Sequence, residues 1–173
     1  MSATKINDGK VAVELLLPFL IYKFIIGSDP STGEYNMRLL WQKVGYLAKQ
    51  VGMPLSEYQF KWYLRGPYSS AYTSVLYDID QNTNELHEQE KQFNLNDTAQ
   101  AVLLPLKEMG NNKPSDMSLP IWFELLASIQ YLNKGSKLTP DELFIKLERY
   151  KPQFNNKYHF DLAYQQLKIG KLL

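Results

Sequence analysis

Apolar residues recur at helical spacing along most of the chain and predict a mainly α fold. In the segment 37–51, Leu40, Val44 and Leu47 lie three or four residues apart, so one face of a helix there is apolar. The continuous apolar run 11–26 predicts a first helix that is buried on most of its faces. The pattern predicts a compact helical domain of six or seven helices. The remaining helices are expected at 71–79, 98–109, 121–132, 140–150 and 158–169.

One short segment has the alternation of a strand instead. Tyr58, Phe60 and Trp62 alternate with more polar residues, so a strand at 58–63 would bury its aromatic side. Gly66 permits backbone angles that are closed to other residues and Pro67 has a fixed φ, so the chain must turn there. The predicted fold class is therefore mainly α with a short strand or β-wing, and its elements resemble those of winged-helix domains.

Residues with short polar side chains mark where the helices begin. Ser, Thr, Asn and Asp favour the N-cap position because their side chains accept hydrogen bonds from free backbone N–H groups. Thr139 and Glu142 have the spacing of a capping box. The other N-cap candidates are Asn7 or Asp8, Asn36, Ser69 or Ser70, Asn94 or Asn96, and Ser118.

Two polar segments separate the helices of the second half of the chain. Residues 80–91 are polar throughout, and we expect a long loop or a surface β-wing there. Residues 110–116 are rich in Gly, Asn and Pro and form the best candidate boundary between subregions. We therefore expect a single domain, 1–173, that consists of the subregions 1–109 and 117–173.

Composition excludes several classes of protein. The chain of 173 residues has a formal net charge of +1, so no global field attracts polyanions and nonspecific nucleic-acid binding is disfavoured. It contains no cysteine, which excludes disulfides, thiolate nucleophiles and Cys-based metal sites. Its two histidines are too few for most metal centres built from histidine. Absence of cysteine suits a reducing cytoplasm, and we expect a cytoplasmic protein.

The apolar run 11–26 also requires a comparison with membrane segments. A spanning helix needs about 20 apolar residues, whereas this run is shorter and includes Glu14 and Lys23. Its polar flanks do not fit a signal peptide either. We expect a buried core helix and no membrane association.

The common catalytic motifs are absent from the sequence. Neither GxGxxG nor GxxxxGK[ST] occurs, and there is no GxSxG and no HExxH. Glu124 is the one acid within an otherwise apolar helix, and we expect it at the surface because an unpaired charge is costly to bury. The sequence therefore predicts no enzyme activity, no cofactor and no metal site.

Aromatic residues and cations are interleaved around the predicted turn, and they form the candidate partner-binding site. The ordinary role of such aromatics is core packing, since tyrosine buries its ring while its hydroxyl stays in water. Aromatic and arginine side chains are also enriched in protein interfaces, and aromatics beside cations stack on nucleobases. Arg65 has two interpretations: it contacts the partner, or it caps backbone carbonyls or pairs with an acid such as Asp78 or Asp80 and so holds the turn. The candidate partner-binding residues are Lys61, Tyr63, Arg65, Gly66, Pro67 and Tyr68.

The polar positions of the second helix also have two interpretations. A solvated face is the ordinary role of such residues. A small basic patch near Lys61 and Arg65 is the functional alternative. The residues concerned are Arg38, Gln42, Lys43 and Lys49.

The segment LLWQKVGYLAKQVGMPLSEYQFKWYLRGPYSSAYTSVLYDI resembles the YwgA-like proteins of bacteria and archaea. Their signature has an LQKLxYL helix, a YxFxxYxxGPYS strand and turn, and a further helix. The C-terminal WFELLASIQYL, LERYKPQF and LKIGKLL are similar to the same family, so the resemblance covers nearly the whole chain. Trp41 departs from the usual leucine. The chain is more distantly similar to the Panacea domain of SocA-like antitoxins.

The resemblance implies no catalytic residues. For the Panacea relatives it implies a protein-binding role in toxin neutralisation, phage defence or mobile-element conflict. We therefore expect a non-enzymatic interaction or regulatory module, antitoxin-like, whose partner is a protein. The alternative is a winged-helix-type DNA-binding regulator. Salt-sensitive binding to duplex DNA distinguishes the two.

Overall fold

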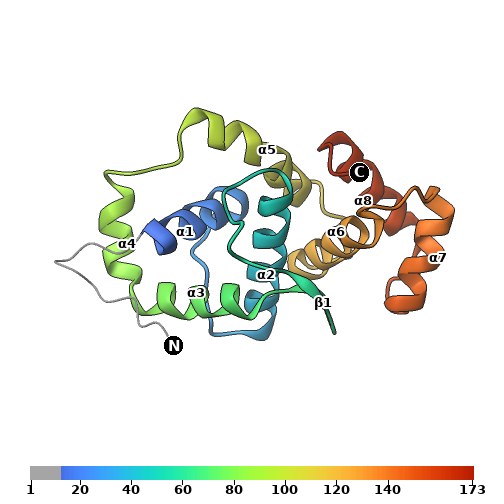
Figure 1. Ribbon diagram of the computed structural model, residues 1–173, viewed down its shortest axis with the longest axis horizontal. Helices are drawn as coiled ribbons and strands as arrows, with labels where there is room; N and C mark the ends of the chain where they lie inside the picture. Colours follow the sequence, from blue (N-terminus) through green and yellow to red (C-terminus); the bar gives the residue numbers. More distant parts are fainter. Residues whose placement is uncertain (1–12) are drawn as a thin grey trace.

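The computed structural model describes residues 13–173, and the predicted cap at Asn7 or Asp8 lies outside them. The predicted fold class is confirmed: the described chain is mainly helical, with one small antiparallel sheet (Figure 1). The helices of the first half are α1 (Val13–Ile26), α2 (Tyr35–Gln50), α3 (Ser70–Gln81), α4 (Thr83–Glu90) and α5 (Asp97–Asn111). Those of the second half are α6 (Leu119–Asn133), α7 (Pro140–Tyr150) and α8 (Lys157–Ile169). The strands are β1 (Lys61–Tyr63) and β2 (Gly66–Tyr68).

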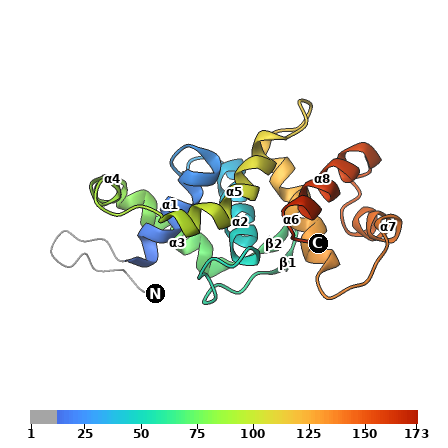
Figure 2. The same cartoon turned by 90° about the horizontal axis from the view of Figure 1, so that it is seen from above.

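Helix α2 occupies the centre of an elongated molecule. In both views α4 lies near one end, α7 and α8 lie at the other, and α2 lies between them (Figures 1 and 2). It packs against α1, α3, α6 and the strand β2. Every residue from Leu39 to Ala48 is buried, so α2 has no solvated face along these turns.

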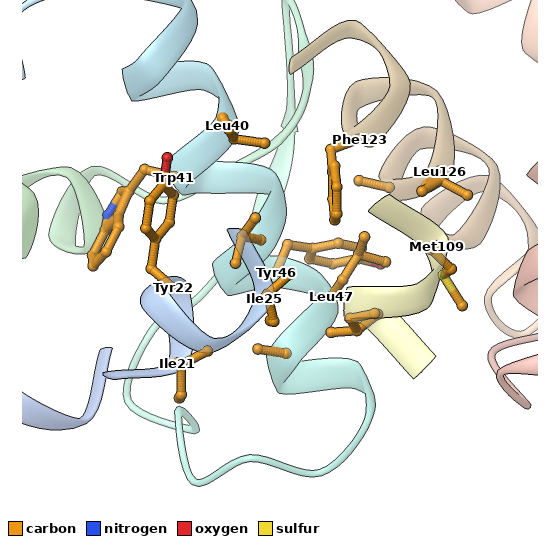
Figure 3. Packing of buried hydrophobic residues seen from close by; sticks show 14 of the residues in the cluster. Ile21, Tyr22, Ile25, Leu40, Trp41, Tyr46, Leu47, Met109, Phe123 and Leu126 are labelled. Atoms are coloured by element: carbon orange, nitrogen blue, oxygen red, sulfur yellow. The ribbon is translucent and has the colours of Figure 1, made fainter. Parts of the chain in front are cut away.

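The apolar core joins the helices on both sides of α2 (Figure 3). Trp41 stacks on Tyr72 with the ring centroids 4.6 Å apart, and its indole N–H donates to the Tyr72 carbonyl at 2.8 Å. On the other side, the buried Trp122 of α6 donates to the carbonyl of Met109 at the end of α5. Each indole thus buries its ring and still has a hydrogen-bond acceptor, as a buried tryptophan requires.

Local caps begin several helices as the sequence predicts. The Ser69 and Asn96 side chains accept from backbone N–H groups in the first turns of α3 and α5. Thr139 forms the complete capping box of α7. The prediction for α2 is wrong: Glu34 is its N-cap and Asn36 lies in the first turn, because the N–H groups of residues 37 and 38 bond to the Glu34 carbonyl.

The loop or β-wing predicted at residues 80–91 is wrong. Helix α3 continues to Gln81, and α4 follows after one residue. Leu86 is fully buried, and Glu90 pairs with Lys23 of α1 at 2.8 Å. The segment is rich in Glu and Gln, which are good helix formers, and the one leucine gives that helix an anchor in the core.

The first helix lies in the core, as its apolar composition predicts. Pro18 is within α1 and is buried. Within residues 13–173, none of the helices is both long enough and apolar enough for a membrane span.

Candidate functional site

The strands β1 and β2 form a hairpin at the turn that the sequence predicts. Lys61 pairs with Tyr68 and Tyr63 pairs with Gly66, which leaves Leu64 and Arg65 as the two loop residues. Gly66 has φ +85°, as its place in the turn requires. The strand is shorter than the predicted 58–63, although the alternation of exposed and inward residues from Tyr58 onward is confirmed.

Polar side chains of α2 bind the backbone around this hairpin. The Gln42 amide donates to the Ser69 carbonyl and accepts from the Ser69 N–H, both at 2.9 Å. Lys43 Nζ donates to the Pro67 carbonyl at 2.6 Å, and Lys49 Nζ donates to that of Tyr58 at 2.7 Å. The predicted solvated face is therefore wrong for Gln42 and Lys43. The hairpin covers that face, and its backbone supplies the hydrogen-bond partners.

The Arg65 guanidinium forms an ion pair with Glu124 of α6. Nε donates to both carboxylate oxygens at 3.0 and 2.9 Å, and Nη2 donates to Oε2 at 2.6 Å. Lys151, the residue after α7, donates to Oε1 of the same carboxylate at 2.8 Å and to the Leu64 carbonyl at 3.1 Å. We call Lys43, Arg65, Glu124 and Lys151 the buried charge cluster.

This geometry corrects two predictions. Glu124 is fully buried rather than at the surface, because two cations pair with its carboxylate. Arg65 does hold the turn through an acid, but that acid is Glu124 and not Asp78 or Asp80. The side chain of Arg65 is still 34 % exposed, so it reaches the surface as well as the buried carboxylate.

Burial shifts the pKa values within the cluster. It lowers the pKa of the Lys43 ammonium to about 7, against a smaller opposing effect of the Glu124 charge. It also lowers the pKa of Lys151, and the hydrogen bond that Lys151 donates to Glu124 partly offsets this. The same carboxylate raises the pKa of Arg65. The cluster therefore holds one lysine whose charge changes near neutral pH.

A pocket of about 280 Å³ opens between α2, the hairpin and α3, and we call it the hairpin pocket. Helix α2 contributes Tyr35, Arg38, Leu39, Gln42 and Lys43. The hairpin contributes Tyr63, Leu64, Arg65, Gly66 and Tyr68. Helix α3 contributes Thr73 and Tyr77. The lining is thus a mixture of tyrosines and cations.

The structure distributes the predicted site residues over two depressions. Tyr63, Arg65, Gly66 and Tyr68 line the hairpin pocket. Lys61 instead lines a second, more open depression, to which Tyr63 and Tyr68 also contribute. The ring of Pro67 is buried and faces neither, so it acts through its carbonyl.

Residues outside the predicted partner-binding set complete the pocket, and of these Arg38, Gln42 and Lys43 belong to the possible basic patch of the second helix. Tyr35 and Arg38 lie on the same side of α2 as Gln42 and Lys43, at helical spacings of three and four residues. This stripe of polar residues on one side of α2 is visible in the sequence and indicates that the helix contributes to the site. Leu64 and Tyr77 offered no signal in the sequence, because their place in the pocket depends on how the hairpin packs against α3.

Comparison of the chain with protein-family models, with curated proteins and with solved structures gives no match. Within residues 13–173, no group of three or more His, Cys, Asp or Glu side chains is placed to hold a metal ion. The two histidines instead pair with single acids, His87 with Asp29 and His159 with Asp116.

Proposed function

We propose that this protein is a non-enzymatic interaction module that binds a segment of a partner protein in the hairpin pocket. The observation that carries the proposal is the gathering of exposed apolar side chains. Twelve large apolar side chains of residues 13–173 are exposed, and five of them line this one pocket: Tyr35, Tyr63, Leu64, Tyr68 and Tyr77. Exposed apolar groups that gather around a concave site are typical of protein contact surfaces.

The size of the pocket favours a side chain as the inserted group. Sites for whole cofactors or drug-sized ligands have volumes of roughly 300 to 1,000 Å³. At about 280 Å³, the hairpin pocket is at the lower limit of that range. An anchor side chain from a partner segment would enter it together with part of a neighbouring side chain, and such anchors contribute much of the free energy of protein association.

The buried charge cluster supports the same function by fixing the hairpin in advance. Glu124 holds Arg65, while Lys43 and Lys151 hold the carbonyls on either side of the turn. A surface that is already ordered loses less conformational entropy when a partner binds. We place the partner in the cytoplasm, in a toxin-neutralising or regulatory system of the kind that the YwgA-like and Panacea-like resemblance implies.

Selection from a random peptide library displayed on phage tests the proposal. We expect the wild-type protein to enrich related peptides, and we expect a Tyr63→Ser, Leu64→Ser double variant to lose their binding by about tenfold or more, as hot-spot losses do. Tyr158→Ser is the matched control, because Tyr158 is similarly exposed, at 66 % against 59 % for Tyr63, and does not line the pocket.

Thermal unfolding of the three proteins shows whether the variants remain folded. Equal enrichment by the wild type and the double variant would contradict the proposed function. Binding to duplex DNA that falls steeply with added salt, and that the double variant retains, would favour the DNA-binding alternative instead.

A further inference from the structure

The charges that line the hairpin pocket are all of one sign. Arg38, Lys43 and Arg65 contribute to the lining, and no Asp or Glu does. The formal net charge of the whole chain is only +1, so this is a local excess of positive charge. Behind the lining, Glu124 is the single carboxylate of the buried charge cluster, and it is shared between Arg65 and Lys151.

The two arginines have hydrogen-bond donors to spare. Arg65 uses Nε and Nη2 for Glu124, and its guanidinium also interacts with the Tyr35 hydroxyl, which leaves part of its five donors. Among residues 13–173, the hydrogen bonds of the Arg38 side chain involve only Nη1, which donates to the Thr32 carbonyl, so its Nε and Nη2 are unused. A guanidinium has five N–H donors in a planar fork, a geometry that matches a carboxylate.

Tyr35 holds both guanidinium groups at the pocket. The guanidinium carbons of Arg38 and Arg65 each lie 5.8 Å from the centroid of its ring. At this distance the ring attracts a cation, and it limits the conformations of two otherwise flexible side chains. Two arginines on one aromatic ring, beside a buried lysine, form a pre-arranged site for an anion.

We infer that the group recognised in the hairpin pocket is the carboxylate of an Asp or Glu side chain in the partner segment, with the surrounding tyrosines in contact with its apolar neighbours. This inference rests on the proposed function and adds the chemistry of the partner. Charge complementarity identifies the occupant: Arg38, Arg65, Lys43 and four tyrosines line a pocket of about 280 Å³ that no carboxylate lines. Each charge-assisted hydrogen bond adds specificity for a planar, anionic group.

Lys43 links this binding to pH. The groups that act on its ammonium are Glu124 of α6, which favours the charged form, and Lys151 and Arg65, which disfavour it. A bound carboxylate is a second negative charge near this ammonium, so it raises the Lys43 pKa and the complex takes up a proton. We therefore expect the affinity to fall severalfold as the pH rises from about 7 to about 9, and the fall to be absent in Lys43→Met.

Matched synthetic peptides test the inference. For each acidic peptide obtained from the phage library, a second peptide has Gln for Glu, or Asn for Asp, at the acidic position. We expect the amide peptide to bind about tenfold or more weakly, since it cannot form a charge-assisted pair with arginine. A calorimetric titration measures both affinities.

Arg38→Gln is the variant of choice because Arg38 does not contact Glu124 and its loss leaves the buried charge cluster intact. We expect the ratio of the affinity for the acidic peptide to that for the amide peptide to fall to about one third or less of its wild-type value, because one charged partner is lost. Lys107→Gln is the matched control: Lys107 is also a half-buried cation beside an aromatic ring, 4.9 Å from Phe24, and does not line the pocket.

The outcomes separate this inference from the proposed function. If selected peptides bind through Tyr63 and Leu64 but carry no acid, or bind equally well as the amide, the carboxylate inference is overturned and the interaction function stands. If no peptide distinguishes the wild type from the double variant, the interaction function itself fails. If inorganic phosphate or a phosphoserine peptide binds more tightly than the carboxylate peptide, the inferred carboxylate is wrong.

Discussion

Gly66 combines two constraints in one residue of the turn. Its φ of +85° belongs to the left-handed region that strains other residues. A Cβ at this position would also lie 2.7 Å from Oγ of Ser128, a fully buried residue of α6. The first constraint is visible in the sequence as Arg65-Gly66-Pro67, whereas the second comes from a helix more than fifty residues away in the chain.

Replacing Gly66 should therefore cost stability for two separable reasons. We expect Gly66→Ala to lower the free energy of unfolding by about 1 kcal/mol from φ strain, and further from contact with Ser128. Among the described residues, the Ser128 hydroxyl is the one buried side-chain oxygen without a hydrogen-bond partner, so Ser128→Ala alone should be close to neutral.

Urea unfolding of the two single variants and the double variant measures this coupling. The double variant should regain the stability lost through the contact with Ser128, and it should still lose the stability that the φ strain at residue 66 costs. Strictly additive losses would show that Ser128 does not restrict residue 66. An unchanged stability in Gly66→Ala would contradict the assigned turn.

The hairpin is an element that other elements complete. Two short strands are only marginally stable by themselves. Here α2 binds the hairpin backbone through Gln42 and Lys43, and Lys151 binds the Leu64 carbonyl. Trp62 of β1 contacts the rings of Tyr131 and Tyr150, so β1 also packs on α6 and the end of α7. The hairpin and the C-terminal helices should therefore unfold together.

Glu124→Gln tests this connection between α6 and the hairpin. The amide leaves two cations, Arg65 and Lys151, without a negative partner, and Lys151 is buried. We expect a loss of about 3 kcal/mol in the free energy of unfolding, which is the usual cost of breaking a buried pair. We also expect faster amide hydrogen exchange in β1 and β2.

Glu88→Gln is the control for this substitution, since Glu88 is exposed and pairs with the exposed Lys91. A change within about 0.5 kcal/mol is expected there. If Glu124→Gln is as mild as the control, the cluster does not anchor the hairpin. A loss confined to Arg65→Ala, with Glu124→Gln unaffected, would assign Arg65 a role outside the cluster.

The whole molecule should respond to pH through Lys43. Burial lowers the pKa of this ammonium from its ordinary value of 10.5 to about 7. Between these pH values the unfolded chain binds the proton and the folded protein does not, so the Lys43 contribution to stability rises with pH. Burying the charged ammonium costs stability. The full cost applies below about pH 7, and it disappears above pH 10.5, where Lys43 is neutral in both the folded and the unfolded chain.

Comparison with Lys43→Met isolates this effect from the other titrating groups. Between pH 7 and pH 9 we expect the stability of the wild type to rise relative to the variant by about 2 kcal/mol, a little less than the maximum of about 1.4 kcal/mol for each of the two pH units. Chemical unfolding at several pH values measures the difference. A constant difference across this range would show that Lys43 keeps an ordinary pKa.

The sequence by itself determined the features that depend on nearby residues. The capping box at Thr139, the helical stripes and the turn at Gly66 are set by backbone groups a few residues away, and the caps of α3 and α5 are narrowed to two nearby candidates each. Their hydrogen bonds and steric limits are local, so composition and spacing suffice to predict them.

Only the tertiary structure decided which polar residues are buried and which residues of α2 and α3 complete the pocket beside the predicted turn. Lys43 and Glu124 have the ordinary spacing of exposed positions on their helices, and each is buried because a group distant in sequence supplies its partner. Likewise, α4 depends on the burial of Leu86, and the hairpin pocket depends on how the hairpin meets α2 and α3. A charge or hydroxyl is stable in the interior only beside its partner, and such partners come together only when the chain has folded.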